Sequence, residues 1–398
     1  MLDDLDSVLE EEEQALEGEP RSRVHKAGRG GRSTIAFFLS LVLLGLLAGG
    51  GWLAYSKVKG LFVADDYAGP GGAEAIVEIK TGQSATDIGT TLYNQKVVAS
   101  VDAFVDAAKD NTRSKNIQAG WYKLKVEMKA ADAVSRLLDP NARWVTKVTL
   151  PEGLTYQQTF QKLSEATKIP VADFVKAAKN PVALGVDASW FTRSDGKKAD
   201  KTDIEGFLYP ATYELSPKAD ATGVLKAIIA NFNAEMDQLE FVSTVRKTRG
   251  GIAPYQALIV ASIAQAEALK DVDMAKVSRV VYNRAYGDFD CHCLGLDSTV
   301  NYWLRITGKG TKASEHLTNA ELHNPKNPYN THDKPGLPPG PIGNPGKAAL
   351  KGAMSPTNNF PYYYFISVDT KGTMAYGKTA ADHDKNRLLA CQNGIPLC

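Results

Sequence analysis

Tyr255–Lys270 reads YQALIVASIAQAEALK and decides the fold of the larger part of this chain. Its residues are apolar almost all the way round the helix, and a helix of this kind is buried on every side. Gln265 and Glu267 interrupt the apolar pattern near the C-terminal end. The stretch therefore predicts a central, buried helix with a carboxylic acid in its last part.

The sequence around this helix indicates a mixed α+β domain. Residues 222–236 carry an apolar stripe at helical spacing, which is typical of a helix that packs on a core. Residues 143–150 alternate like a strand and lead into the turn Pro151-Glu152-Gly153. Further helices are expected at 156–166, 171–178 and 274–286, and a terminal hairpin at 366–368 and 373–376.

A smaller α+β module is predicted before this domain. Residues 75–79 are expected to form a strand, and Ser84 with Asp87 three positions later predicts the capped start of a helix. A helix at 101–109, a strand at 120–124 and a helix at 128–138 complete the module. Its size suits a glycan-binding or spacer module.

A membrane anchor is predicted near the N-terminus. Residues 35–55 contain no charge over 21 positions, which is long enough for one membrane-spanning helix. Five basic residues precede the run and only Lys57 and Lys59 follow closely, so the positive-inside rule places the N-terminus in the cytoplasm. A cleaved signal peptide is the alternative. The expected division is a tail at 1–32, a transmembrane helix at 33–56, a linker at 57–74, the small module at 75–140 and the large domain at 141–398.

The charge of the chain is nearly balanced but unevenly distributed. The 398 residues carry a net charge of +1, which argues against nucleic-acid binding. Residues 1–32 hold nine acidic and five basic side chains, a net charge of −4, so the remainder carries +5. The acidic start is interpreted as a solvated leader, with a partner-binding tail as the alternative.

Two further features concern the large domain. Residues 324–346 are dense in turn residues, with seven prolines in 23 positions, and predict a binding loop held in one shape. All four cysteines follow the predicted anchor, where disulfides persist. We expect Cys291 or Cys293 to pair with Cys391 or Cys398, because a bond between Cys291 and Cys293 would be strained. A metal site that includes His292 is the alternative.

Glu267 is the candidate catalytic residue. Burial raises the pKa of a carboxylic acid, and a protonated acid near neutral pH can protonate a leaving oxygen. The alternatives are an exposed helix end or an ion pair with Arg279 or Arg284. The motifs of serine hydrolases, zinc proteases and nucleotide-binding loops are absent from the sequence, and no cofactor or resident metal is expected.

Nine short motifs occur along about 320 residues of the chain. They are Gln118–Tyr122, Leu150–Gly153, Glu205–Tyr213, Ala261–Glu267, Val281–Arg284, Asp297–Val300, Pro328–Thr331, Gly336–Ile342 and Lys378–His383. With these motifs in this order, the chain resembles the YceG-like family of endolytic murein transglycosylases.

The resemblance implies a membrane-anchored lytic transglycosylase whose extracytoplasmic domain cleaves peptidoglycan strands. It assigns catalysis to Glu267, and Gln265 stands where the family has a first acidic residue. It further implies that the small module is LysM-like and contributes to glycan binding. The membrane, through one helix, and peptidoglycan synthases are the other partners that it suggests.

Nine residues in or next to the matched motifs are candidate substrate ligands. Amides, hydroxyls and rings suit sugar hydroxyls and acetamido groups, and Arg284 suits a carboxylate of the peptide stem. Glu205 could instead hold a turn, and Arg284 could instead pair with an acid. The candidates are Glu205, Gln265, Tyr282, Asn283, Arg284, Asp297, Thr299, Asn330 and His332. The residues before Asp297, and His332 itself, depart from the family pattern.

Two other functions remain open at this point. One is a muramidase-like hydrolase that uses Glu267 and Glu205 with water, and the other is a catalytically inactive scaffold that binds the cell wall.

Overall fold

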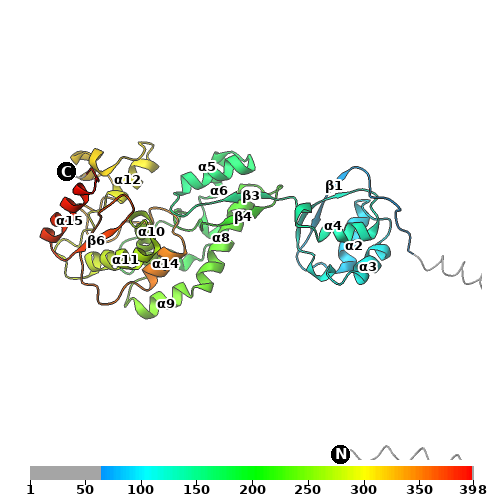
Figure 1. The fold of residues 1–398 in the computed structure, drawn as a ribbon, viewed down its shortest axis with the longest axis horizontal. Coiled ribbons are helices and arrows are strands. Elements are labelled where there is room, and N and C mark those ends of the chain that lie inside the picture. The colour runs from blue at the N-terminus through cyan, green and yellow to red at the C-terminus, as the bar shows by residue number, and fades with distance from the viewer. Residues whose placement is uncertain (1–63, 397–398) are drawn as a thin grey trace, which may run out of the picture. The chain divides into compact units, whose positions relative to one another are not determined.

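The computed structural model describes residues 64–396 as a mixed α+β chain with many helices and small antiparallel sheets (Figure 1). This agrees with the expected fold class. The predicted tail, the predicted transmembrane helix and residues 57–63 of the predicted linker lie outside the described residues. In the described part, no helix is both long and apolar enough to cross a membrane.

The small module agrees closely with its predicted elements. Strands β1 (Glu74–Ile79) and β2 (Gly120–Lys125) pair antiparallel, with Val77 opposite Tyr122. Its helices are α2 (Ala85–Asn94), α3 (Val101–Asp110) and α4 (Ala130–Leu137).

The start of α2 has the capping hydrogen bonds that the sequence predicts for Ser84 and Asp87. Ser84 Oγ accepts a hydrogen bond from Asp87 N at 3.2 Å, and Asp87 Oδ2 accepts one from Ser84 N at 2.9 Å. This reciprocal capping box satisfies two backbone donors that the helix itself cannot satisfy. The capping hydrogen bonds also lower the pKa of Asp87.

The remaining described residues form one large helical group with two small two-stranded sheets. Strands β3 (Thr146–Thr149) and β4 (Thr212–Leu215) pair antiparallel, as do β5 (Tyr364–Ser367) and β6 (Met374–Gly377). The helices are α5 (Tyr156–Thr167), α6 (Val171–Ala177), α7 (Pro181–Leu184), α8 (Ala221–Gln238), α9 (Phe241–Thr248), α10 (Pro254–Glu267), α11 (Asp271–Tyr286), α12 (Asp297–Ile306), α13 (Asn319–Leu322), α14 (Lys347–Met354) and α15 (Ala380–Gln392).

Helix α10 is the buried central helix that the sequence predicts. Every residue from Tyr255 to Ala264 is buried, and the helix packs against α11 and α14 (Figure 1). It ends at Glu267, three residues earlier than predicted, because Ala268 has an extended backbone. The last turn of α10 is therefore where polar side chains of this helix leave the core.

Asn344 joins three loops that are distant in the sequence. Its Oδ1 accepts hydrogen bonds from Gly206 N at 3.0 Å and Leu208 N at 2.9 Å. Its Nδ2 donates to Leu154 O at 2.8 Å and to Glu205 Oε1 at 3.0 Å. A buried amide with all these partners fixes the turns around α10 in one arrangement.

Several element boundaries differ from the expectations. The strand expected at 143–150 is confined to β3, and α4 begins at Ala130 rather than at residue 128. Six helices and one strand were not anticipated, because each is short or carries a weak apolar pattern. They are α7, α9, α12, α13, α14, α15 and β4.

The expected disulfide pairing was wrong. Cys291 bonds to Cys293, so neither of these residues pairs with Cys391 or Cys398. The chain turns sharply between the two cysteines, and His292 adopts a left-handed backbone with a φ of 46°. This turn brings their Cα atoms to 5.0 Å, a normal separation for a disulfide. Cys391 is also disulfide-bonded.

Replacement of Gly206 by Ala is expected to destabilise the large helical group by about 2–3 kcal/mol. Gly206 has a φ of +88°, and a Cβ there would lie 2.7 Å from Pro341 Cγ. Gly196→Ala is the matched control, since its φ is +76° but no atom lies within 4 Å of an added Cβ. Urea denaturation should show a loss of only about 1 kcal/mol for the control. Equal losses in both variants would mean that contact with Pro341 is unimportant.

Candidate active site

Glu267 is the last residue of α10, and its side chain is half-buried. Burial raises the pKa of this carboxyl to about 7, the nearby Ser298 hydroxyl lowers it, and the Asp297 carboxylate raises it. A substantial fraction of Glu267 is therefore protonated at neutral pH, as a general acid requires.

Asp297, the first residue of α12, is the charged neighbour that acts on Glu267. Its Oδ1 lies 3.1 Å from His332 Nε2. Burial raises the pKa of Asp297, but hydrogen bonds with His332 and Ser314 outweigh this effect and hold the pKa below its ordinary value. The two acids thus differ at neutral pH, because Asp297 is ionised whereas a substantial fraction of Glu267 is protonated.

Ser298 follows Asp297 and also acts on the catalytic candidate. Its Oγ is buried and has no hydrogen-bond partner among the described residues. The hydroxyl nevertheless lies close enough to Glu267 to lower the pKa of that carboxyl. Hydrogen bonds in active sites are often long without substrate, so this hydroxyl is available to the ionised form of Glu267.

The loop that carries His332 is fastened to the start of α12. Thr331 Oγ1 lies 2.9 Å from Thr299 Oγ1 and accepts a hydrogen bond from Leu296 N at 3.1 Å. Asn330 Oδ1 accepts a hydrogen bond from His332 N at 2.9 Å. Thr299 and Asn330 are buried and hold the segment that brings His332 to Asp297.

Gln265 lies on the same turn of α10 as Glu267 but contacts a different segment. Its Oε1 accepts a hydrogen bond from Gly346 N, the N-cap of α14, at 2.9 Å. Residues two positions apart on a helix do not face each other. The structure therefore places Gln265 as a link between α10 and α14.

Glu205 is fully buried in the interior. Burial and the neighbouring Asp203 raise the pKa of Glu205 well above its ordinary value. Its oxygens accept hydrogen bonds from Tyr156 N at 3.0 and 3.1 Å and from Asn344 Nδ2 at 3.0 Å. These contacts fit the turn-holding role that the sequence left open for this residue.

Tyr282, Asn283 and Arg284 lie on α11 and donate to backbone carbonyls. Tyr282 is buried and donates to Ala353 O at 2.9 Å. Asn283 Nδ2 donates to two carbonyls of the segment before β5, each at 2.9 Å. Arg284 Nε donates to Cys293 O at 2.9 Å, and its guanidinium lies 4.2 Å from the Phe289 ring centroid.

The structure thus brings Glu267, Asp297 and His332 together out of the predicted set. The other candidates hold the surrounding segments through the contacts above, and their roles as substrate ligands stay predictions. Sequence reasoning did not single out Ser298 or Ser314. Ser298 stands inside the quoted Asp297–Val300 motif, which was the available signal.

No cluster of His, Cys, Asp and Glu side chains suited to a metal ion occurs among residues 64–396. The described contacts of the site are made by side-chain carboxyl, hydroxyl, imidazole and amide groups and by backbone amides.

Comparison with known proteins identifies the family of this chain. The profile of the YceG-like family matches residues 77–388, which is most of the chain. The chain belongs to the YceG-like family. The matched range includes Glu267, Asp297 and His332.

Two relatives of this YceG-like chain carry the name endolytic murein transglycosylase. The protein of Bacillus subtilis (strain 168) is 26% identical over 314 residues, which cover 78% of this chain and 82% of that protein. The protein of Streptococcus pneumoniae D39 is 25% identical over 371 residues, or 88% of this chain. The match spans 64% of the length of the pneumococcal protein.

A crystal structure of a YceG-like protein from Listeria monocytogenes has a similar fold. The two chains superpose with a TM-score of 0.51 and are 27% identical. The match covers 79% of this chain and 99% of the other.

Ser298→Ala is expected to raise the pKa of Glu267 by roughly 0.5 to 1, because the carboxylate loses a hydroxyl that stabilises its charge. Ser278→Ala is the matched control. Ser278 Oγ is also buried without a partner among the described residues, but it does not act on Glu267. Carbon-detected NMR titration of selectively labelled Glu residues measures the effect.

Asp297→Asn is expected to shift the pKa of Glu267 in the opposite direction in the same titration. It removes the negative charge that disfavours ionisation of Glu267, so the pKa of Glu267 should fall. A Ser298→Ala variant that titrates like Ser278→Ala would contradict the assignment of the hydroxyl.

Proposed function

We propose that this YceG-like chain is an endolytic lytic transglycosylase of peptidoglycan. It cleaves the bond between N-acetylmuramic acid and N-acetylglucosamine without adding water and leaves 1,6-anhydromuramic ends. Such cleavage within nascent strands limits their elongation.

One observation carries the proposal. Of the two acids of the site, only Glu267, at the end of a buried helix, has its pKa raised to about 7. It therefore gives a proton readily and takes it back readily near neutral pH, as one residue must if it serves as both acid and base.

The reaction follows from this one acid. Glu267 protonates the glycosidic oxygen, and the bond to the muramic carbon breaks as an oxocarbenium-like centre develops. The resulting carboxylate removes the proton from the 6-hydroxyl of the same sugar, which attacks that carbon. The nucleophile is held within the substrate, so it competes effectively with water.

The neighbours of Glu267 support this cycle. Asp297 remains ionised through its contact with His332, and a fixed negative charge stabilises a developing oxocarbenium centre. The Ser298 hydroxyl can donate to the Glu267 carboxylate formed after protonation of the leaving group.

The hydrolase alternative needs a second carboxylate that ionises and activates water. Glu205 suits this role poorly, because it is fully buried and burial raises its pKa. Asp297 is ionised beside Glu267, but its Oδ1 is already engaged at 3.1 Å from His332 Nε2. A binding scaffold without catalysis would have no need for an acid tuned to neutral pH. These arguments favour the transglycosylase.

The proposal extends to the location and the partners of the chain. We place residues 33–56 in the cell membrane as a single span, with the catalytic part outside the cytoplasm. The small module is proposed to be LysM-like, and peptidoglycan synthases are proposed to supply the nascent strands.

Glu267→Gln is expected to reduce cleavage of uncrosslinked glycan strands by roughly 100-fold or more, since the amide cannot donate the required proton. Mass spectrometry of the wild-type products should show ends lighter by one water than the products of a muramidase. Reducing muramic ends from the wild-type chain would overturn the reaction class.

Glu205→Gln is the matched control, because it makes the same chemical change in another acid of the family motifs. The variant should keep the anhydro product, and circular dichroism should verify its fold. Loss of activity in a folded Glu205→Gln chain would favour the two-carboxylate hydrolase.

The rate is expected to fall as the pH rises through about 7, because the free enzyme must hold Glu267 in its protonated form. The measurement is kcat/KM against pH on one strand preparation at constant ionic strength. A rate that rises through this range would show that the ionised form of Glu267 begins the reaction.

A further inference from the structure

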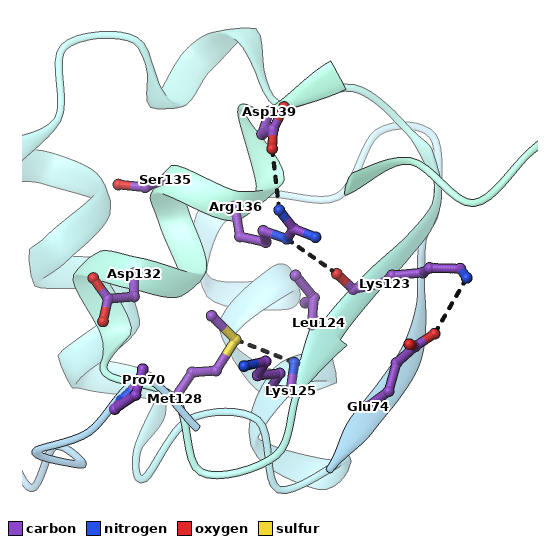
Figure 2. A pocket seen from close by; sticks show the side chains of 10 residues that line it. All are labelled: Pro70, Glu74, Lys123, Leu124, Lys125, Met128, Asp132, Ser135, Arg136 and Asp139. Atoms are coloured by element: carbon purple, nitrogen blue, oxygen red, sulfur yellow. Dashed lines mark hydrogen bonds and ion pairs between the residues drawn. The ribbon is translucent and has the colours of Figure 1, made fainter. Parts of the chain in front are cut away.

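A pocket lies on the small module, between strand β2 and helix α4 (Figure 2). It has a volume of about 560 Å³, which is within the range of small-ligand sites. Pro70, Leu124 and Met128 provide its apolar lining, and the charged side chains stand around them.

Most charges of this pocket are paired with each other. Lys123 Nζ lies 3.4 Å from Glu74 Oε1, and Arg136 Nη1 lies 3.1 Å from Asp139 Oδ2 (Figure 2). Arg136 Nε also donates to Lys123 O at 3.4 Å. These pairs join the walls of the pocket and leave little of their charge for a ligand.

Lys125 and Asp132 differ from these pairs. Lys125 belongs to β2 and Asp132 to α4, both are exposed, and neither has an ion-pair partner among residues 64–396. The pocket therefore offers one cation and one anion from two different elements, with apolar surface also in the lining. Its complement is a ligand with a carboxylate, an ammonium group and apolar atoms.

A sugar chain is a weaker fit to this pocket. Sugar-binding sites commonly present an aromatic ring against the apolar face of the sugar, and none of the ten residues that line the pocket is aromatic. A bare glycan of N-acetylated sugars also carries no ammonium group that Asp132 could bind.

We propose that this pocket binds the peptide stem of peptidoglycan, with a stem carboxylate at Lys125 and the side-chain ammonium of a diamino acid at Asp132. The inference depends on the proposed function, which makes peptidoglycan the substrate. The module then recognises the peptides while Glu267 acts on the glycan. Two weak contacts on one chain increase the effective concentration of each strand at the enzyme.

The test measures binding directly, in the full chain in detergent micelles with Glu267→Gln to prevent cleavage. The probe is a fluorescent, N-acylated tetrapeptide, L-Ala-γ-D-Glu-L-Lys-D-Ala, followed by anisotropy. Chitotetraose is the competing sugar probe. Binding of the peptide should weaken as salt is added, because the contacts are exposed ion pairs.

Lys125→Glu is expected to weaken peptide binding by roughly fivefold or more, since it replaces attraction by repulsion. Lys129→Glu is the matched control: it makes the same charge change on the same module, and Lys129 is exposed but does not line the pocket. Asp132→Lys should weaken binding as Lys125→Glu does. Equal affinities of the Lys125→Glu and Lys129→Glu chains, or displacement of the peptide by chitotetraose, would overturn the proposal.

Activity gives a second readout that separates this inference from the proposed function. In the chain with Glu267 intact, Lys125→Glu should raise KM for peptide-bearing strands and leave kcat unchanged. Strands stripped of peptides by an amidase should show no difference between Lys125→Glu and wild type. If the chain cleaves nothing, the proposed function fails while the binding measurement still decides the inference.

Discussion

Helix α10 has no polar face, and this constraint governs the arrangement of the large helical group. All ten residues from Tyr255 to Ala264 are buried, so other elements must cover the helix on every side. Its polar side chains can emerge only where the helix ends. The same burial that stabilises the core therefore sets the position of Glu267 and raises the pKa of its carboxyl.

The loops around α10 are held by polar contacts rather than by regular secondary structure. Asn344 binds the turns at Leu154, Gly206 and Leu208, and Ser262 of α10 accepts a hydrogen bond from Ile342 N at 3.0 Å. Buried amides and hydroxyls that are fully partnered favour one arrangement over its alternatives. The loop at 324–346, which is rich in proline and glycine, is thus held in one conformation beside α10.

The site places two carboxyls in different electrostatic environments. Glu267 is affected by burial, by the Ser298 hydroxyl and by the Asp297 carboxylate, whereas Asp297 lies against His332. A catalyst that must both give and accept one proton needs the first environment, and the second keeps a fixed negative charge beside it. The Ser298 hydroxyl lowers the pKa of Glu267 and so favours its ionised form.

The sequence by itself determined the elements whose signals are local. The apolar run of α10, the capping box at Ser84 and the acid at position 267 can all be read from neighbouring residues. Only the tertiary structure decided which candidates meet, because His332 reaches Asp297 through contacts between segments more than 30 residues apart. It also paired Cys291 with Cys293, against the expectation, since that bond depends on a backbone turn that residue types do not specify. The sequence specifies the chemical type of each side chain. Its pKa also depends on its burial and on its neighbours, which are defined only in the folded chain.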